Sequence, residues 1–105
     1  EVHDAGKPAE RFFCHLVLGA FTDPNQRLDQ RYNPWINMSG IGMDAAYRVW
    51  HRGLTVYCTS NTGYQGWLQA IAHAAKDIYG NPSTELTAVR EAAKTININI
   101  DSYNP

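Results

Sequence analysis

The sequence lacks both a long hydrophobic run and an excess of charge of either sign. No stretch approaches the roughly 20 apolar residues that a membrane-spanning helix needs, and the first residues, EVHDAGKPAER, have no basic-then-apolar signal pattern. Nine basic residues against ten acidic ones give a formal net charge of -1. No run of Lys or Arg indicates a surface for nucleic acid or anionic lipid. We therefore expect neither nucleic acid nor a membrane among the partners.

Cysteine is also scarce. The two cysteines, Cys14 and Cys58, do not have the CxxC spacing of a zinc knuckle or a redox motif. They could form a disulfide only if the fold brings them together. The alternative is two buried free thiols that act as small hydrophobic side chains. Both interpretations stay open on the sequence.

Common catalytic motifs are absent as well: the sequence contains no HExxH, no G-x-S-x-G, no P-loop and no G-x-G-x-x-G after a strand. We interpret Ser39-Gly40-Ile41-Gly42 as a turn into a helix. His15, His51 and His73 have no partner at metal-ligand spacing, so we expect them to be structural or surface residues. Cys14 and His15 are adjacent on a predicted helix and point about 100° apart, so they form no nucleophile–base pair.

What is present is a chain of 105 residues with 44% hydrophobic and 18% charged residues, which suits one packed core. Apolar residues recur at helical spacing in four segments. The segments run from Pro8 to Gly19, within 40–57, within 64–80, and from Ser83, a predicted N-cap, through Ala93. We expect Trp50 and Trp67 on the second and third segments to lie in the core.

Two segments outside these helices have other patterns. Residues 21–37 are rich in Pro, Asp and Asn, which predicts a long surface loop. This loop contains Trp35, whose role stays open. At the end of the chain Ile96, Ile98 and Ile100 alternate with Asn, a strand-like pattern without a partner strand. The sequence therefore predicts one all-α domain over residues 1–105, with four helices, a long loop after the first and an extended C-terminal tail.

Short motifs follow one another in a fixed order from Ser39 to Ile98. They are Gly40-Ile41-Gly42 with Asp44, Arg52-Gly53-Leu54, Tyr57-Cys58-Thr59, Asp77-Ile78-Tyr79-Gly80 and Glu85-Leu86. The series resembles, without a detectable gap, the closing segment of thermolysin-like zinc metallopeptidases (bacillolysins). The resemblance implies that the four helices form the C-terminal helical lobe of such an enzyme.

The first residues resemble another segment of this family, DVHxSSGxxNRAFYLL. The matching residues are Val2, His3, Arg11, Phe13 and Leu16. In the family this His is not a zinc ligand but donates a hydrogen bond to the oxyanion that forms during peptide hydrolysis. The resemblance thus makes His3 the candidate catalytic residue. The sequence departs from the family pattern at Ala5-Gly6-Lys7 and at Glu10.

The resemblance further implies part of a secreted metalloendopeptidase, in which this lobe forms one wall of the substrate cleft. This chain would bind no cofactor itself, because HExxH is absent; zinc and the general base would belong to an N-terminal catalytic lobe. Its partners would be that lobe and a peptide or protein substrate, and the isolated chain would be inactive. The alternative is a non-catalytic helical protein-binding module with the same fold, which the changed Ala5-Gly6-Lys7 turn and the loop around Trp35 favour.

Overall fold

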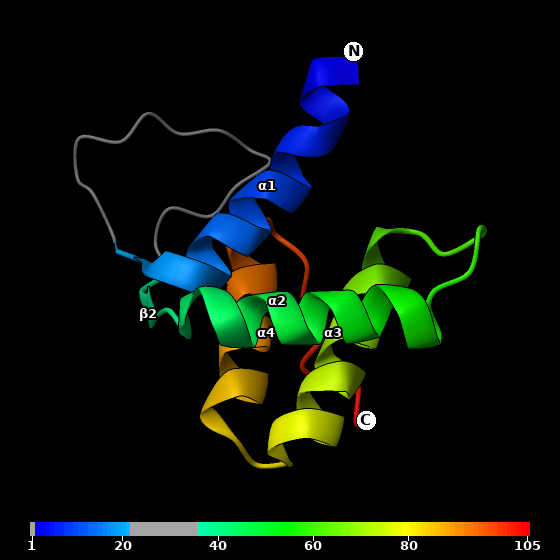
Figure 1. The fold of residues 1–105 in the computed structure, drawn as a ribbon. Coiled ribbons are helices and arrows are strands. Elements are labelled where there is room, and N and C mark those ends of the chain that lie inside the picture. Colours follow the sequence, from blue (N-terminus) through cyan, green and yellow to red (C-terminus); the bar gives the residue numbers. More distant parts are fainter. Residues whose placement is uncertain (1, 22–35) are drawn as a thin grey trace.

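The computed structural model describes residues 2–21 and 36–105, with side chains from residue 8 onward. In chain order the elements are α1 (Val2–Leu18), β1 (Gly19–Ala20), β2 (Met38–Ser39), α2 (Gly42–Arg52), the π-helical turn η1 (Gly53–Tyr57), α3 (Tyr64–Tyr79) and α4 (Thr84–Thr95). The predicted all-α fold with four helices is confirmed. In Figure 1, α2 crosses over α3 and α4, and α1 lies against the same bundle.

The first helix begins at Val2 and not at Pro8, so its predicted start is wrong. Proline favours the first turn of a helix, because inside a helix it removes one hydrogen bond and its ring clashes with the carbonyl four residues back; the structure nevertheless places Pro8 inside α1. The predicted apolar face is confirmed, because Phe12 and Leu16 are fully buried. Phe13 and Val17 pack at the edge of the core.

A two-residue antiparallel pair follows α1. Gly19 lies opposite Ser39, and Ala20 lies opposite Met38. The sequence did not indicate this pair, because each strand is too short to show alternation. It brings the two ends of the predicted loop together; residues 22–35 of that loop, with Trp35, lie outside the described residues.

The second predicted helix is divided at Gly53. Cys58 N–H donates to the Gly53 carbonyl at 3.2 Å, five residues back, which widens the last turn into η1. Glycine allows η1 to lie close to α3, since a Cβ at Gly53 would be only 3.0 Å from Ile71 Cα. The wider turn moves Leu54 off the predicted apolar face, and its side chain is 38% exposed. Ala46 and Val49 on that face are buried as predicted.

The last two helices follow the sequence signals closely. Gly80 ends α3 with a positive φ of 101°, as expected of a C-cap glycine. Ser83 caps α4, with its Oγ accepting from Leu86 N–H at 3.0 Å. The buried faces of α3 and α4 are rich in alanine, and Leu68, Leu86 and Val89 fill the space between the helices.

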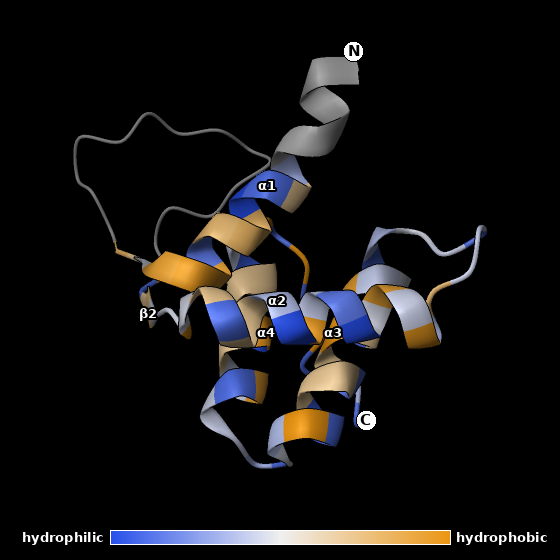
Figure 2. Ribbon diagram, in the orientation of Figure 1, coloured by the Kyte–Doolittle hydropathy of each residue, from blue (hydrophilic) through white to orange (hydrophobic). Residues whose placement is uncertain are grey.

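The C-terminal tail packs on the helices. Ile96 and Ile100 are buried and Ile98 lies at the edge of the core. Within the described part of the chain the tail has no strand partner, so the alternation reflects burial of alternate side chains. Figure 2 shows apolar residues on each of the helices, several of them on outer surfaces. No helix among the described residues is long and apolar enough to cross a membrane.

Candidate functional site

The candidate catalytic residue, His3, belongs to the first turn of α1. Its side chain is outside the described residues, so its assignment stays a prediction. The side chains further along α1 show how this helix is held. The packing of these side chains against the other helices determines how firmly the start of α1 is held.

A cluster of four aromatic side chains fixes α1 on α2 and α3. The Phe12 ring meets Trp67 edge to face, with centroids 5.4 Å apart, and Phe13 meets Trp50 at 4.9 Å. Trp50 and Trp67 meet each other at 5.1 Å. Such pairs stabilise by about 0.5 to 1.5 kcal/mol beyond area burial. The prediction that both tryptophans belong to the core holds in part, because both pack against it but stay half-buried.

Two adjoining pockets open beside this cluster, and we call them together the aromatic groove. Each has a volume of about 330 Å³, and Ala9 and Trp50 line both. The first pocket is also lined by Leu54, Cys58, Thr59, Thr62, Gly63, Tyr64 and Trp67. The second is also lined by Glu10, Phe13, Cys14 and Tyr47. Glu10 is the one charged side chain in the lining, so the groove suits an uncharged, apolar ligand.

The two cysteines lie in different pockets of the groove, and both are free thiols in the structure. Cys14 is exposed, so its interpretation as a buried thiol is wrong. It follows Phe13 on α1 and falls outside the buried face that Phe12 and Leu16 define. Cys58 is half-buried, and burial raises the pKa of its thiol.

The three other histidines have separate surroundings. His15 is half-buried; burial first, and the nearby Arg11 second, lower the pKa of its imidazole. His51 is exposed on α2 and stacks on Tyr47, with centroids 5.6 Å apart. His73 Nδ1 lies 3.0 Å from the Tyr103 hydroxyl and joins the C-terminal tail to α3.

The described residues do not form a zinc site. Nowhere in residues 8–21 and 36–105 do three His, Cys, Asp or Glu side chains gather at ligand distance. A zinc ion needs three or four such ligands.

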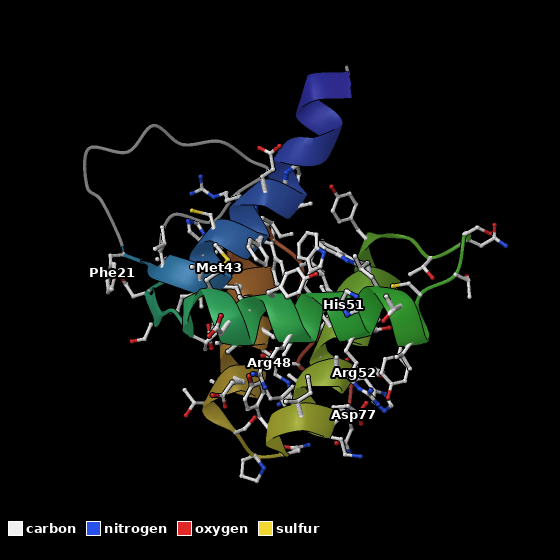
Figure 3. All side chains as sticks on the ribbon, viewed as in Figure 1. Phe21, Met43, Arg48, His51, Arg52 and Asp77 are labelled. Atoms are coloured by element: carbon white, nitrogen blue, oxygen red, sulfur yellow. The ribbon has the colours of Figure 1, made fainter. Side chains whose placement is uncertain are left out.

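Asp77 forms a polar cluster with Arg52 and Tyr57 that sequence reasoning missed. Arg52 Nε donates to Asp77 Oδ2 at 3.0 Å, and the Tyr57 hydroxyl donates to the same oxygen. Figure 3 shows Arg52 and Asp77 side by side below α2. The Tyr57 bond, followed by the Arg52 guanidinium, holds the pKa of the Asp77 carboxyl below its usual range. The cluster ties η1 to α3, and its three residues all lie in the motifs that carry the family resemblance.

The family model and the individual relatives that match this chain all point to the same group of peptidases. The family model described as "Thermolysin metallopeptidase, alpha-helical domain" matches residues 2–98. Neutral protease B of Bacillus subtilis (strain 168) is 33% identical over 63 residues, which is 60% of this chain and 12% of the relative. Thermolysin of Alicyclobacillus acidocaldarius is 29% identical over 63 residues, with the same shares. The Transglutaminase-activating metalloprotease of Streptomyces mobaraensis is 28% identical over 100 residues, which is 93% of this chain and 13% of the relative. The chain thus spans about an eighth of the length of these relatives.

Proposed function

Because this chain belongs to the thermolysin metallopeptidase family as its alpha-helical domain, we propose that it is the C-terminal lobe of a secreted zinc metalloendopeptidase. The whole enzyme hydrolyses internal bonds of peptide or protein substrates, and this lobe forms one wall of the substrate cleft. Residues 1–105 act as a single domain. The observation that carries the proposal is the family match over residues 2–98, which begins in the first turn of α1 and includes His3.

Zinc belongs to a different part of the same polypeptide in this proposal. The described residues contain no three-ligand set, so they do not fit the metal. An N-terminal catalytic lobe with HExxH supplies the ligands and the general base. This chain hydrolyses no peptide by itself.

His3 contributes a hydrogen-bond donor. Its imidazole N–H donates to the oxyanion of the tetrahedral intermediate, where negative charge develops as the peptide bond is attacked. A donor of this kind is effective only if it is held in place before the reaction. The aromatic cluster supports such placement, because it fixes α1 to two other helices through Phe12 and Phe13.

The test compares three versions of the complete gene product: the natural sequence, His3→Ala and His51→Ala. Cleavage of a hydrophobic peptide should be zinc-dependent in the natural protein, and His3→Ala should lower kcat by about 10² to 10³, the usual loss for an oxyanion donor. His51→Ala is the matched control, since this imidazole is exposed on α2. It should keep full activity. An unchanged kcat in the His3→Ala enzyme would contradict the proposed role of His3. The 105-residue chain by itself should cleave no peptide, with or without zinc.

A second candidate is the non-catalytic binding module with the lobe's fold. The open aromatic groove favours it, since apolar grooves of this volume bind ligands in many proteins. The departure at Ala5-Gly6-Lys7 also favours it. A complete gene product that is folded, secreted and unable to cleave any peptide with zinc present would support this candidate over the peptidase.

A further inference from the structure

A short turn in the C-terminal tail, which we call the tail turn (residues 99–103), contacts two helices at once. Tyr103 N–H donates to the Ile100 carbonyl at 2.9 Å, and the Asn99 side chain accepts from Asp101 N–H at 2.8 Å. A bond from residue i to i+3 and an Asn side chain that bonds two residues on are both local, so the turn fixes its own shape. The family match ends at residue 98, so the tail turn lies just beyond the matched residues.

On α4, two basic side chains hold the tail turn. Lys94 Nζ lies 2.7 Å from Asp101 Oδ2, and Arg90 Nη2 donates to the Tyr103 carbonyl at 3.1 Å. The bond to Asp101 raises the pKa of the Lys94 ammonium above its ordinary value. Arg90 and Lys94 are four residues apart, so they lie on one face of α4. The tail turn therefore follows this face for about one turn of the helix.

On α3, the tail turn reaches a row of side chains that leads to η1. His73 Nδ1 lies 3.0 Å from the Tyr103 hydroxyl. The His73 ring also lies against the Tyr57 ring, with centroids 4.3 Å apart, and its Nε2 is 3.8 Å from Asp77 Oδ1. Arg52 and Tyr57 both donate to this carboxylate. Tyr103 thus joins α4, through its carbonyl, to the polar cluster that ties η1 to α3.

The apolar anchor of the tail turn is Ile100. Its side chain is 1% exposed and belongs to the same core cluster as Ile71 of α3 and Val89 of α4. A buried isoleucine contributes more to stability than a partly exposed ion pair does. The anchor and the polar contacts lie within four consecutive residues. The tail turn can therefore leave the helices only by losing these contacts together.

We propose that the tail turn is a clamp that locks α3 to α4 and attaches or detaches as one cooperative unit. In the attached state Ile100 closes the core, and Tyr103 holds His73 against η1. In the detached state the four helices keep their own hydrogen bonds, but η1 loses this support. The clamp is thus an opening unit separate from the helices. Because Leu54 of η1 lines the aromatic groove, the state of the clamp also determines how firmly that wall of the groove is held.

The first test measures hydrogen exchange by peptide-resolved mass spectrometry, together with Tm, in the 105-residue chain. Ile100→Asp should detach the clamp, because the buried site offers the new carboxylate no partner. Exchange in the tail should become faster by roughly tenfold or more, and Tm should fall by roughly 10 °C. Ser102→Asp is the matched control, since Ser102 lies in the same turn and is exposed. It should leave both measurements unchanged, and a tail that exchanges equally slowly in Ile100→Asp overturns the proposal.

A milder variant tests the connection to η1 without opening the core. Tyr103→Ala keeps Ile100 but removes the ring that contacts His73. Exchange should become faster in the tail and in η1, while α2 keeps its protection. Faster exchange in the tail alone overturns the proposed support of η1. Loss of protection in all helices together also overturns the proposal, because the tail turn would then be part of a single unfolding unit.

Cooperative attachment is tested by combining two changes. Tyr103→Phe removes one hydrogen bond and should lower Tm of the natural chain by roughly 5 °C. In the Ile100→Asp background the same change should have no effect, since Tyr103 has already left His73. If Ile100→Asp does not fold, Tyr103→Ala serves as the detached background and Arg90→Met as the second change. Equal losses of Tm in the natural and detached backgrounds overturn the clamp, because the contacts would then act independently.

Discussion

Among the glycines that the structure describes, Gly40 is the one where an added Cβ would make the shortest contact with main-chain atoms. An ideal Cβ at Gly40 would lie 2.3 Å from the Val17 carbonyl oxygen and 2.6 Å from both Gly19 N and Leu18 C. All three are main-chain atoms where α1 passes into β1, so no side chain can rotate out of the way. Relief of the shortest contact requires a main-chain shift of roughly 0.7 to 1 Å.

The cost of Gly40→Ala follows from what this shift separates. The Ile41 N–H donates to the Leu16 carbonyl at 2.8 Å, and β1 pairs with β2 beside it. Loss of one or two such hydrogen bonds costs about 1 kcal/mol each, and overpacking costs about 1 to 3 kcal/mol more. We expect the free energy of unfolding to fall by about 2 to 4 kcal/mol, which lowers Tm by at least about 10 °C in a domain of this size.

Urea denaturation followed by tryptophan fluorescence measures this loss in the 105-residue chain, and Gly66→Ala is the matched control. Gly66 is helical, and a Cβ there would meet only Thr62 Cγ2, a side-chain methyl, at 3.2 Å. Alanine has a better helix propensity than glycine by about 1 kcal/mol, so this variant should be as stable as the natural chain or slightly more stable. If Gly40→Ala unfolds at the same urea concentration as the natural chain, the close approach of β2 to α1 is not as described.

Two other predictions concern the helices. Ser83→Ala should lower the free energy of unfolding by about 1 kcal/mol, because it removes the cap on Leu86 N–H; Thr84→Ala, one residue further on, should have a smaller effect in the same denaturation assay. His15 should make the fold sensitive to mild acid. Burial lowers the pKa of its imidazole below the ordinary value near 6.5, so its contribution to stability is present above that value and is lost as the pH falls through the lower folded pKa. Between pH 7 and pH 5 the natural chain should lose more stability than His15→Asn, and equal losses would show that His15 is not buried as described.

Local signals predicted α3 and α4 well, because Gly80 and Ser83 act on the neighbouring main chain. Gly80 has a positive φ and Ser83 bonds to an N–H three residues on. The π-helical turn at Gly53 could not be predicted in this way. It depends on the close approach of Ile71, which is far away in the sequence. The hydrogen bond between Arg52 and Asp77 could not be predicted for the same reason, because the two residues are 25 positions apart in the sequence.

The candidate site also has a part that could be predicted from the sequence and a part that could not. His3 could be named only from the family resemblance, since a single histidine has no pattern of its own. The groove could not be predicted at all, because helical periodicity assigns Trp50, Leu54 and Trp67 to an apolar face without telling what covers that face. The structure shows that α1 covers only part of it.

The aromatic cluster connects the groove physically to the helix that carries His3. Trp50 and Trp67 line the groove, and their rings also hold Phe13 and Phe12 of α1. Any occupant of the groove would therefore contact the same rings that hold the helix of His3. Since packed side chains transmit small displacements to their neighbours, occupancy of the groove would restrict the motion of α1 relative to the bundle.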